Sequence, residues 1–271
     1  MTAFGLKIRR AAFTAAGVFL TLAACAGQTQ KNKAVRTPDG KPNLSGIWQT
    51  MGTANWDIEG HAAHSGPVLA LGAAGAVPGG LGVVEGGEIP YQPWAVAKKK
   101  ENAQNWLKAD PEIKCYMPGV PRATYMPFPF QIVQTPKHIL IAYEFAGATR
   151  TIYMDSQAES PVDTWMGWSR GHWDGETLVV DVNSFNDQTW FDRAGNFHSE
   201  ALHVVERYTP ISPDALRYDV TIEDPKVFTR PWKMSMPLYR RLDKNVQLLD
   251  FKCVEFVEEL IYGPLRRKAA K

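Results

Sequence analysis

The sequence has few cysteines and no apolar segment long enough to cross a membrane as a helix. Only three cysteines occur among 271 residues, at positions 25, 115 and 253. A spanning helix needs roughly 20 consecutive apolar residues, and the apolar run 11–24 is shorter than that. We therefore expect neither a membrane-spanning helix nor a metal site built from several thiolates.

Several motifs of nucleotide-binding and hydrolytic proteins are also missing. The glycines of 72–87 are not followed by the Lys-Ser/Thr pair of a phosphate-binding loop. Ser169 in WSRGHW does not stand in a G-x-S-x-G elbow, and Ser199 next to His198 lacks the turn that presents a nucleophile. Strands and helices do not alternate, which argues against a parallel sheet.

An excess of charge of either sign is absent. The chain has 30 Lys and Arg against 28 Asp and Glu. Without the three basic residues of the first 24 positions, 27 basic residues stand against 28 acidic ones, a net charge of −1. This near-balance argues against a nucleic-acid partner. The basic end 266–271 is interpreted as a solvated tail.

The N-terminus has the pattern of an export signal. Lys7, Arg9 and Arg10 precede the apolar run 11–24, which ends in Leu-Ala-Ala-Cys25. This ending resembles a bacterial lipobox, and the resemblance implies cleavage before Cys25 and its lipidation. Because Ala26 and not Asp follows, it also implies the outer membrane, with the domain facing the periplasm or the surface. The alternative is an ordinary secretory signal.

These boundaries predict one folded domain. We expect a signal peptide over 1–24, a flexible tether over 25–38, a β-barrel domain over 39–265 and the basic tail 266–271. In an exported protein the two remaining cysteines, Cys115 and Cys253, are predicted to form a disulfide. The alternative is two unconnected thiols.

Short runs of alternating apolar and polar residues predict a mainly β fold. The expected strands are 44–50, 130–135, 139–145, 149–155, 165–173, 177–183, 201–209, 216–223, 233–240 and 247–254. Short links such as Asp174-Gly175 indicate hairpins, so we predict an antiparallel meander that is closed or nearly closed into a barrel. One accessory helix is expected over 94–108, with Trp94, Ala97 and Trp106 facing inward, and the glycine-rich stretch 65–87 is predicted to be a long loop.

Two long stretches resemble a widespread group of exported bacterial proteins. RTPDGKPNLSGIWQ (36–49) is similar to the opening of that group, and GHWDGETLVVDVNSFNDQTWFDRAGNFHSEALHVVERY (171–208) is similar to its most recognisable block. DPKVFTRPW (224–232) and the late Cys253 also match, so the resemblance covers nearly the whole mature chain. It implies export and a β-rich fold, and it implies no activity.

A shorter stretch resembles the lipocalins, eight-stranded cups that hold one small ligand. Gly46-Ile47-Trp48 is similar to their G-x-W element on the first strand. In that family the Trp closes the base of the barrel, often against a cationic side chain near the end of the chain. The resemblance implies that Arg240 or Arg241 stacks on Trp48.

The stretch FNDQTWFDRAGNFHSEALHV (185–204) connects two predicted strands and is too long for a hairpin turn. It is too aromatic to be disordered, so we expect it to cover one mouth of the barrel. Trp190, Phe191 and Trp173 would provide apolar walls for a small aromatic, sugar-like or carboxylate-bearing ligand. Arg150, Arg122 and His198 would provide polar contacts; the alternative for both arginines is a structural ion pair.

The same loop allows a second hypothesis, an acid–base enzyme without a cofactor. Asp192 could orient His198 as a general base, and His203 on the following strand could face the barrel interior. The reaction would be that of a lyase, isomerase or hydrolase. The alternative is that Asp192 caps a turn, that His198 lies on the rim and that His203 is structural.

No cofactor and no metal are predicted. His61 and His64 have a helix-like spacing, but no third ligand lies nearby in the sequence. A third hypothesis, a scaffold in a complex of the cell envelope, would require no cavity. The sequence leaves open whether the protein is an enzyme and which proteins it contacts.

Overall fold

The computed structural model describes residues 35–67 and 69–251. The predicted signal peptide, the lipidation site Cys25, Cys253 and the basic tail lie outside these residues, so the disulfide and the anchor stay predictions. Cys115, the other half of the predicted disulfide, ends the short 3-10 helix η2 (Pro111–Lys114) in a left-handed conformation. No helix among the described residues has the length and apolar character needed to span a bilayer.

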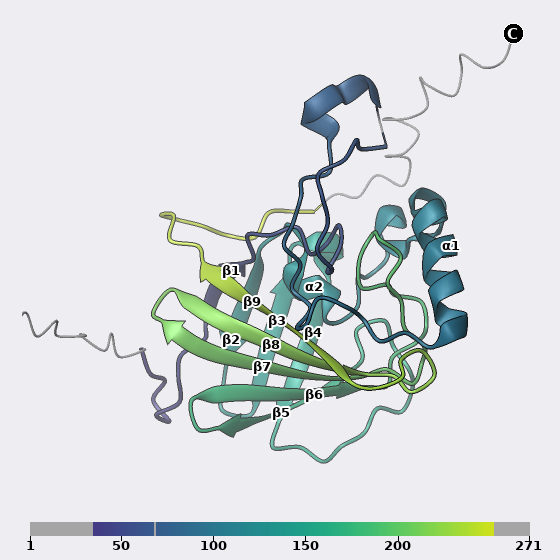
Figure 1. Ribbon diagram of the computed structural model, residues 1–271. Coiled ribbons are helices and arrows are strands. Elements are labelled where there is room, and N and C mark those ends of the chain that lie inside the picture. Colours follow the sequence, from purple (N-terminus) through teal and green to yellow (C-terminus); the bar gives the residue numbers. More distant parts are fainter. Residues whose placement is uncertain (1–34, 68, 252–271) are drawn as a thin grey trace, which may run out of the picture. The chain divides into compact units, whose positions relative to one another are not determined.

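Nine strands form a closed barrel, which confirms the predicted mainly β fold (Figure 1). In chain order they are β1 (Gly46–Gln49), β2 (Phe130–Gln134), β3 (His138–Tyr143), β4 (Thr149–Met154), β5 (Trp168–Asp174), β6 (Thr177–Asn183), β7 (His203–Ser212), β8 (Ala215–Glu223) and β9 (Trp232–Arg240). Each strand pairs with its neighbour in the sequence, and β1 pairs with β9. The expected tight turn at Gly175 joins β5 and β6, with Gly175 at φ +58°.

One pair departs from the predicted antiparallel meander. β4 and β5 are parallel, with Ile152 opposite Ser169. The reason is that the barrel has an odd number of strands, so strict up-and-down alternation cannot close on itself and one neighbouring pair must be parallel. The connection 155–167 crosses back along the barrel to make this pairing possible.

The tenth predicted strand, 247–254, is wrong in its described part, because 247–251 has no strand geometry. Pairing of β9 with β1 has already closed the sheet. The accessory helix is confirmed as α1 (Pro93–Ala109), with Pro93 at its first position. Its inward face is not the predicted one: Ala95 and Asn102 are buried, whereas Trp94 is 55% exposed.

The pairing of β1 with β9, which closes the barrel, is short. Only Trp48 and Gln49 pair with β9. Farther along, the edge of β9 is covered by the end of the glycine-rich segment, where Glu85 N donates to Lys233 O and Ser235 N donates to Val83 O. The loop therefore protects an edge that would otherwise present unpaired backbone groups.

The predicted stacking on Trp48 is confirmed, with Arg240 as the cation. The guanidinium carbon of Arg240 lies 4.2 Å from the centre of the Trp48 ring, and Trp48 is fully buried. The Trp48 Nε1 donates to Leu44 O at 2.8 Å, while Arg240 Nη1 donates to Ser45 O at 2.7 Å. Arg241, the other candidate, pairs with Asp243 on the surface.

Gly46 is predicted to be required for this closure. It has φ +144°, and a Cβ atom at this position would lie 2.1 Å from Arg240 Nη1. We expect Gly46→Ala to lower the free energy of unfolding by about 1–3 kcal/mol through backbone strain and displacement of Arg240. Urea unfolding would measure it, with Gly52→Ala as control, because the only atom near a Cβ there is Thr50 Oγ1 at 3.9 Å. Equal stability of the two variants would contradict the prediction.

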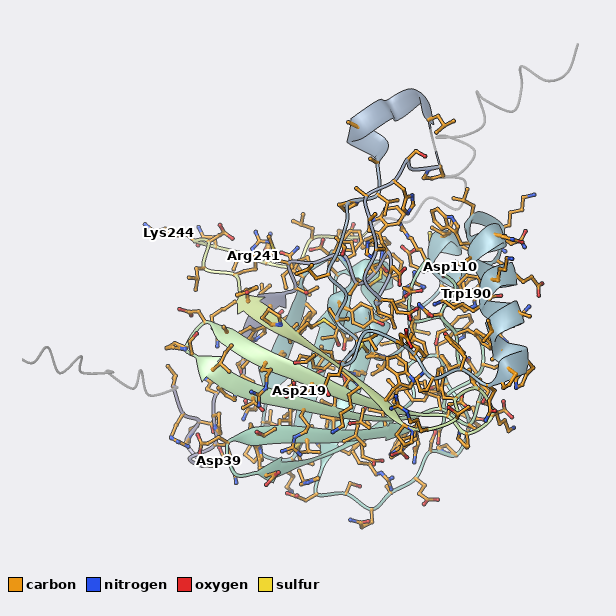
Figure 2. All side chains as sticks on the ribbon, viewed as in Figure 1. Asp39, Asp110, Trp190, Asp219, Arg241 and Lys244 are labelled. Atoms are coloured by element: carbon orange, nitrogen blue, oxygen red, sulfur yellow. The ribbon has the colours of Figure 1, made fainter. Side chains whose placement is uncertain are left out.

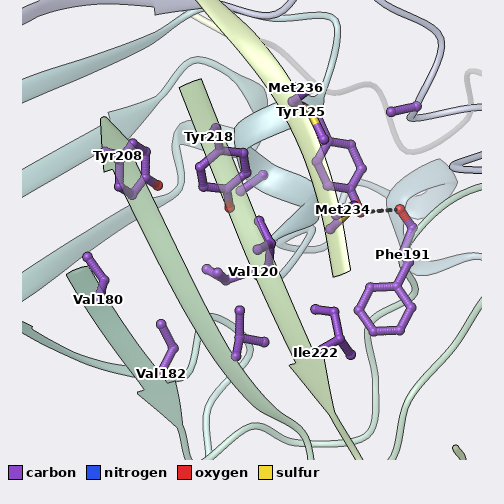
Figure 3. Close-up of a cluster of buried hydrophobic side chains, with 14 of the residues drawn as sticks. Val120, Tyr125, Val180, Val182, Phe191, Tyr208, Tyr218, Ile222, Met234 and Met236 are labelled. Carbon is purple, nitrogen blue, oxygen red and sulfur yellow. Dashed lines mark hydrogen bonds between the residues drawn. The ribbon is translucent and has the colours of Figure 1, made fainter. Parts of the chain in front are cut away.

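The barrel interior is filled with side chains. Alternate residues of each strand point inward, and Figure 3 shows Val180, Val182 and Ile222 among those that are fully or almost fully buried. The short helix α2 (Arg122–Tyr125) is completely buried as well. Tyr125 packs in the same cluster, and its hydroxyl donates to Phe191 O at 2.8 Å (Figure 3). The lumen is a packed core and not an open cup.

One end of the barrel carries the longest connections, and we call it the loop end. Among the segments that leave or enter the strands there are 50–58, 122–129, 184–202 and 224–231, as the strand pairings show. Residues 61–80 run outward and return, with bridges from His61 to Gly80 and from His64 to Val77. The 3-10 helix η1 (Leu69–Gly75) lies at the tip of this excursion (Figure 1).

Candidate functional site

The long loop 184–202 is a packed platform and not an open rim. Asp192 at its centre is fully buried, and its carboxylate accepts hydrogen bonds from Ile58 N, Asn196 N and Asn196 Nδ2 at 2.9, 3.1 and 2.6 Å. Gly195 has φ +88° and contacts α1 so closely that a Cβ atom would lie 2.6 Å from Lys99 O. Asp192 thus ties the loop to the 50–58 segment.

His198 is also buried and has partners on both ring nitrogens. Nδ1 lies 2.8 Å from Ser199 O, so it carries the hydrogen, and Nε2 lies 2.6 Å from Thr189 Oγ1, which must donate to it. Burial lowers the pKa of His198, although the bond to Ser199 opposes this effect. A neutral imidazole that is hydrogen-bonded through both ring nitrogens is a structural element of the loop.

The predicted pair of Asp192 and His198 is not formed. The hydrogen-bond partners of the two side chains are different, and the ring of Phe191 packs against His198 with 5.4 Å between ring centres. The physical reason is that each group satisfies backbone and side-chain partners of its own segment. The structure therefore gives no support to Asp192 as the orienting group of a His198 base.

His203, the other predicted base, points away from the barrel interior. Val204 and Glu206 occupy the inward positions of β7, which leaves His203 on the outer face between Asp181 at 2.8 Å and Glu223 at 3.4 Å. The hydrogen bond to Asp181 raises the pKa of His203. His203 belongs to a surface ion-pair cluster, and the expectation that it faces the barrel interior is wrong.

The lumen contains a buried polar cluster, and Arg150 belongs to it and is not available to a ligand. Its guanidinium donates to both oxygens of Glu206, at 2.7 and 3.0 Å, and to the hydroxyl of Tyr208 at 2.9 Å. Tyr208 and Tyr218 donate to the same Glu206 oxygen. This cluster is buried, so Arg150 fills the alternative role, that of a structural ion-pair partner.

Arg122 has the corresponding role at the loop end. Its Nη1 and Nη2 donate to the two carboxylate oxygens of Asp110, both at 2.8 Å, and its Nε donates to Asn55 Oδ1 at 3.1 Å. Asp110 follows α1 directly (Figure 2). The pair joins α1 to α2 and to the 50–58 segment. The predicted ligand contact at Arg122 is replaced by this buried link.

Of the three predicted aromatic walls, Phe191 belongs to the core, and Trp173 and Trp190 pack against it. Phe191 is buried and packs edge-to-face on Trp232, with 5.6 Å between ring centres. Trp190 pairs with Phe197 across the loop, and both Trp190 and Trp173 pack on the core cluster. None of these three residues lines the cleft described next.

A cleft of about 300 Å³ lies at the loop end, between the outward excursion, α1 and the long loop. Its volume is at the lower limit for small-molecule sites. The lining residues are Trp56, Asp57, His61, His64, Ser65, Gly66, Pro67, Val77, Ala103, Trp106, Arg193 and Ala194. They combine two indole rings with one carboxyl, two imidazoles and one guanidinium, which is the mixture of apolar surface and few polar groups that orients a ligand.

Arg193 organises the aromatic side of this cleft. Its guanidinium carbon lies 4.4 Å from the ring centre of Trp56 and 5.4 Å from that of Trp106. The two indoles meet edge-to-face with 5.9 Å between their centres. Glu112 holds Arg193 from behind through two hydrogen bonds of 2.9 Å. Although burial raises the pKa of Glu112, the charges of Arg122 and Arg193 lower it.

Asp57 is the carboxyl group that lines the cleft, and it is electrostatically linked to the buried Asp192. Partial burial raises the pKa of Asp57, while the hydrogen bond from Glu59 N opposes the rise. Burial, together with the charge of Asp57, raises the pKa of Asp192 to about 7. The site therefore holds two carboxyl groups, of which one, Asp57, borders the cleft.

Sequence reasoning missed most of this cleft. Arg193 lies in the loop predicted to cover the barrel mouth, but Trp56 and Asp57 were not considered. Trp106 was expected only as an inward-facing residue of the helix, and His61 and His64 only as metal ligands. A usable signal was present in WDIEGHAAH (56–64), which holds one indole, two carboxyls and two imidazoles in nine positions.

The described residues give no support to a metal site. Within 35–67 and 69–251, no three His, Cys, Asp or Glu side chains come together as a metal site. Both ring nitrogens of His61 face carbonyl oxygens, of Glu59 at 2.9 Å and of Pro78 at 3.1 Å. His64 Nδ1 likewise faces Ser65 O at 2.9 Å. The two histidines hold the excursion together.

Comparisons of the chain with models of protein families, with curated proteins and with solved structures find no match.

Proposed function

We propose that the protein is a lipid-anchored, cell-envelope β-barrel protein that binds a small organic ligand in the cleft at its loop end. The observation that carries this proposal is the cleft itself, where Trp56, Trp106 and Arg193 form one wall and Asp57 and His64 lie among the other lining residues. The lumen is a poorer candidate, because the core side chains and the Arg150–Glu206 cluster fill it.

The envelope location rests on the N-terminal sequence. The basic residues at 7, 9 and 10, the apolar run 11–24 and Cys25 together match the order of a lipoprotein signal. Several acyl chains on Cys25 would hold the protein to a membrane without a spanning helix. Globomycin, which blocks the lipoprotein signal peptidase, tests this: the unprocessed precursor should accumulate, and normal processing of a Cys25→Ala variant to the same mature size would contradict it.

Ligand binding is tested with two tryptophans of one helix. Trp106 and Trp94 both belong to α1, but only Trp106 lines the cleft, whereas the Trp94 Nε1 donates to Lys226 O. Isothermal titration with phenol and with methyl glucopyranoside would provide small ring-shaped probes. We expect Trp106→Ala to weaken binding of the preferred probe at least tenfold and Trp94→Ala to leave it unchanged. Unchanged binding in correctly folded Trp106→Ala would contradict a ligand site in this cleft.

Acid–base catalysis is the second candidate function. The candidate base is then His64 in the cleft, in place of the predicted His198. The favouring observation is that His64 Nδ1 faces a carbonyl oxygen, which leaves Nε2 as a possible acceptor in a cleft that the Asp57 carboxyl group also lines. His64→Gln distinguishes the two candidates. An enzyme would lose turnover of the bound probe in this variant, whereas a binding protein would show no turnover in the wild type or in the variant.

A further inference from the structure

The hydrogen-bonding atoms of the cleft can be divided into those with a partner and those without one. Asp57 Oδ1 accepts from Glu59 N at 2.9 Å, and Oδ2 has no hydrogen-bond donor within the described part of the chain. His64 Nδ1 must carry the hydrogen, because the carbonyl of Ser65 that it faces can only accept. Nε2 of His64 then has no partner among the described residues and can serve as a second acceptor.

Arg193 contributes the complementary donor. Its Nε and Nη2 are bonded to the two oxygens of Glu112, both at 2.9 Å. Nη1 has no acceptor within 35–67 and 69–251, although the side chain is only 20% exposed. The flat faces of Trp56 and Trp106 lie next to this guanidinium. The cleft thus offers two acceptors and one donor beside an aromatic wall.

From this inventory we infer that the ligand is an uncharged ring that carries two neighbouring hydroxyl groups. Each hydroxyl can donate to one of the acceptors, Asp57 Oδ2 or His64 Nε2, and its oxygen can accept from Arg193 Nη1. The ring itself would pack on the indoles. This inference rests on the proposed function and narrows the three ligand classes predicted from the sequence.

Charged rings are disfavoured for electrostatic reasons. A carboxylate ligand would bring its charge next to Asp57, whose own charge already acts on the buried Asp192. An ammonium ligand would meet the guanidinium of Arg193, which is fixed in place by Glu112. Each charged group therefore meets a like charge as well as an opposite one, whereas a neutral hydroxyl can use both the donor and the acceptors.

The inference is tested with rings that differ only in their substituents. Isothermal titration would compare catechol, phenol, benzoate and benzylammonium, with methyl glucopyranoside as a non-aromatic diol. We expect a diol to bind at least fivefold more tightly than phenol, and both charged rings to bind more weakly than phenol. Asp57→Asn should weaken binding of the diol more than binding of phenol, because the single hydroxyl of phenol can donate to His64 Nε2 instead. A general loss of structure would weaken the binding of both probes equally.

The possible outcomes distinguish failure of the diol inference from failure of the proposed ligand-binding function. If catechol binds best, the ligand class is an aromatic diol; if the glucopyranoside binds best, the class is a carbohydrate. Tightest binding of benzoate or benzylammonium, or equal affinities for catechol and phenol in the absence of glucopyranoside binding, would overturn the diol inference while leaving a ligand site in place. If none of the five probes binds wild-type protein, the proposed function fails as well.

Discussion

Glu206→Gln is expected to lower the free energy of unfolding by about 3–5 kcal/mol, because it leaves a buried guanidinium without its counter-charge. Glu206 is fully buried and accepts four hydrogen bonds, two from Arg150 and one each from Tyr208 and Tyr218. The substitution keeps the shape of the side chain and removes the charge. Urea unfolding monitored by circular dichroism would measure the change.

A surface ion pair on the same sheet provides the control. Asp174 pairs with Arg207 at 2.7 Å, but the pair is exposed to solvent, so Asp174→Asn should leave the stability unchanged within error. Replacement of both buried partners, Arg150→Met with Glu206→Leu, should recover most of the loss. If Glu206→Gln were as stable as the wild type, Arg150 would have to be solvated or neutral, and our description of the lumen would be wrong.

Asp192 is expected to make the protein less stable as the pH rises from 5 to 8. Burial and the charge of Asp57 raise its pKa from 3.8 to about 7, so the folded state binds this proton more tightly than the unfolded state. The contribution of Asp192 to the free energy of unfolding therefore falls between the unfolded and the folded pKa. At about 1.4 kcal/mol per pH unit, the fall between pH 5 and pH 8 is about 2–3 kcal/mol.

Asp192→Asn isolates this contribution from the other titrating groups. His203, whose pKa is raised, loses stability in the same direction, whereas His198, whose pKa is lowered, acts in the opposite direction at acidic pH. Both are retained in the variant, so the difference between the two pH profiles belongs to Asp192 and its neighbour Asp57. A carboxyl carbon NMR titration of wild-type protein gives the pKa directly. Parallel stability profiles together with a pKa near 4 would refute the prediction.

The barrel was predictable from the sequence because its evidence is local. Alternation identifies the inward residues of each strand, and Gly175 specifies a tight turn without reference to the rest of the chain. The stacking of Arg240 on Trp48 was predictable only by resemblance, since the two residues are far apart in the sequence. The odd total number of strands requires a parallel pair, which here is β4 and β5. No single segment of the sequence reveals that total number.

The site was not predictable, because its geometry depends on which distant segments meet. Asp192 was expected to bond to His198, six residues away, but its partner across the chain is the backbone of Ile58. Composition identified 185–204 as unusual and could not tell that its aromatic residues would be buried by 224–232. Arg193 reaches the cleft because Glu112, on another segment, holds it there.

The direction in which β1 runs has a consequence for how the molecule would be oriented in the envelope. The chain enters the barrel at Ser45, next to Arg240, and this is the end opposite to 50–58 and to the cleft. The chain that precedes β1 therefore joins the barrel at the end that does not carry the cleft. If Cys25 is acylated as we propose, the attachment leaves the loop end without a covalent link to the lipid, and the cleft free to exchange solutes.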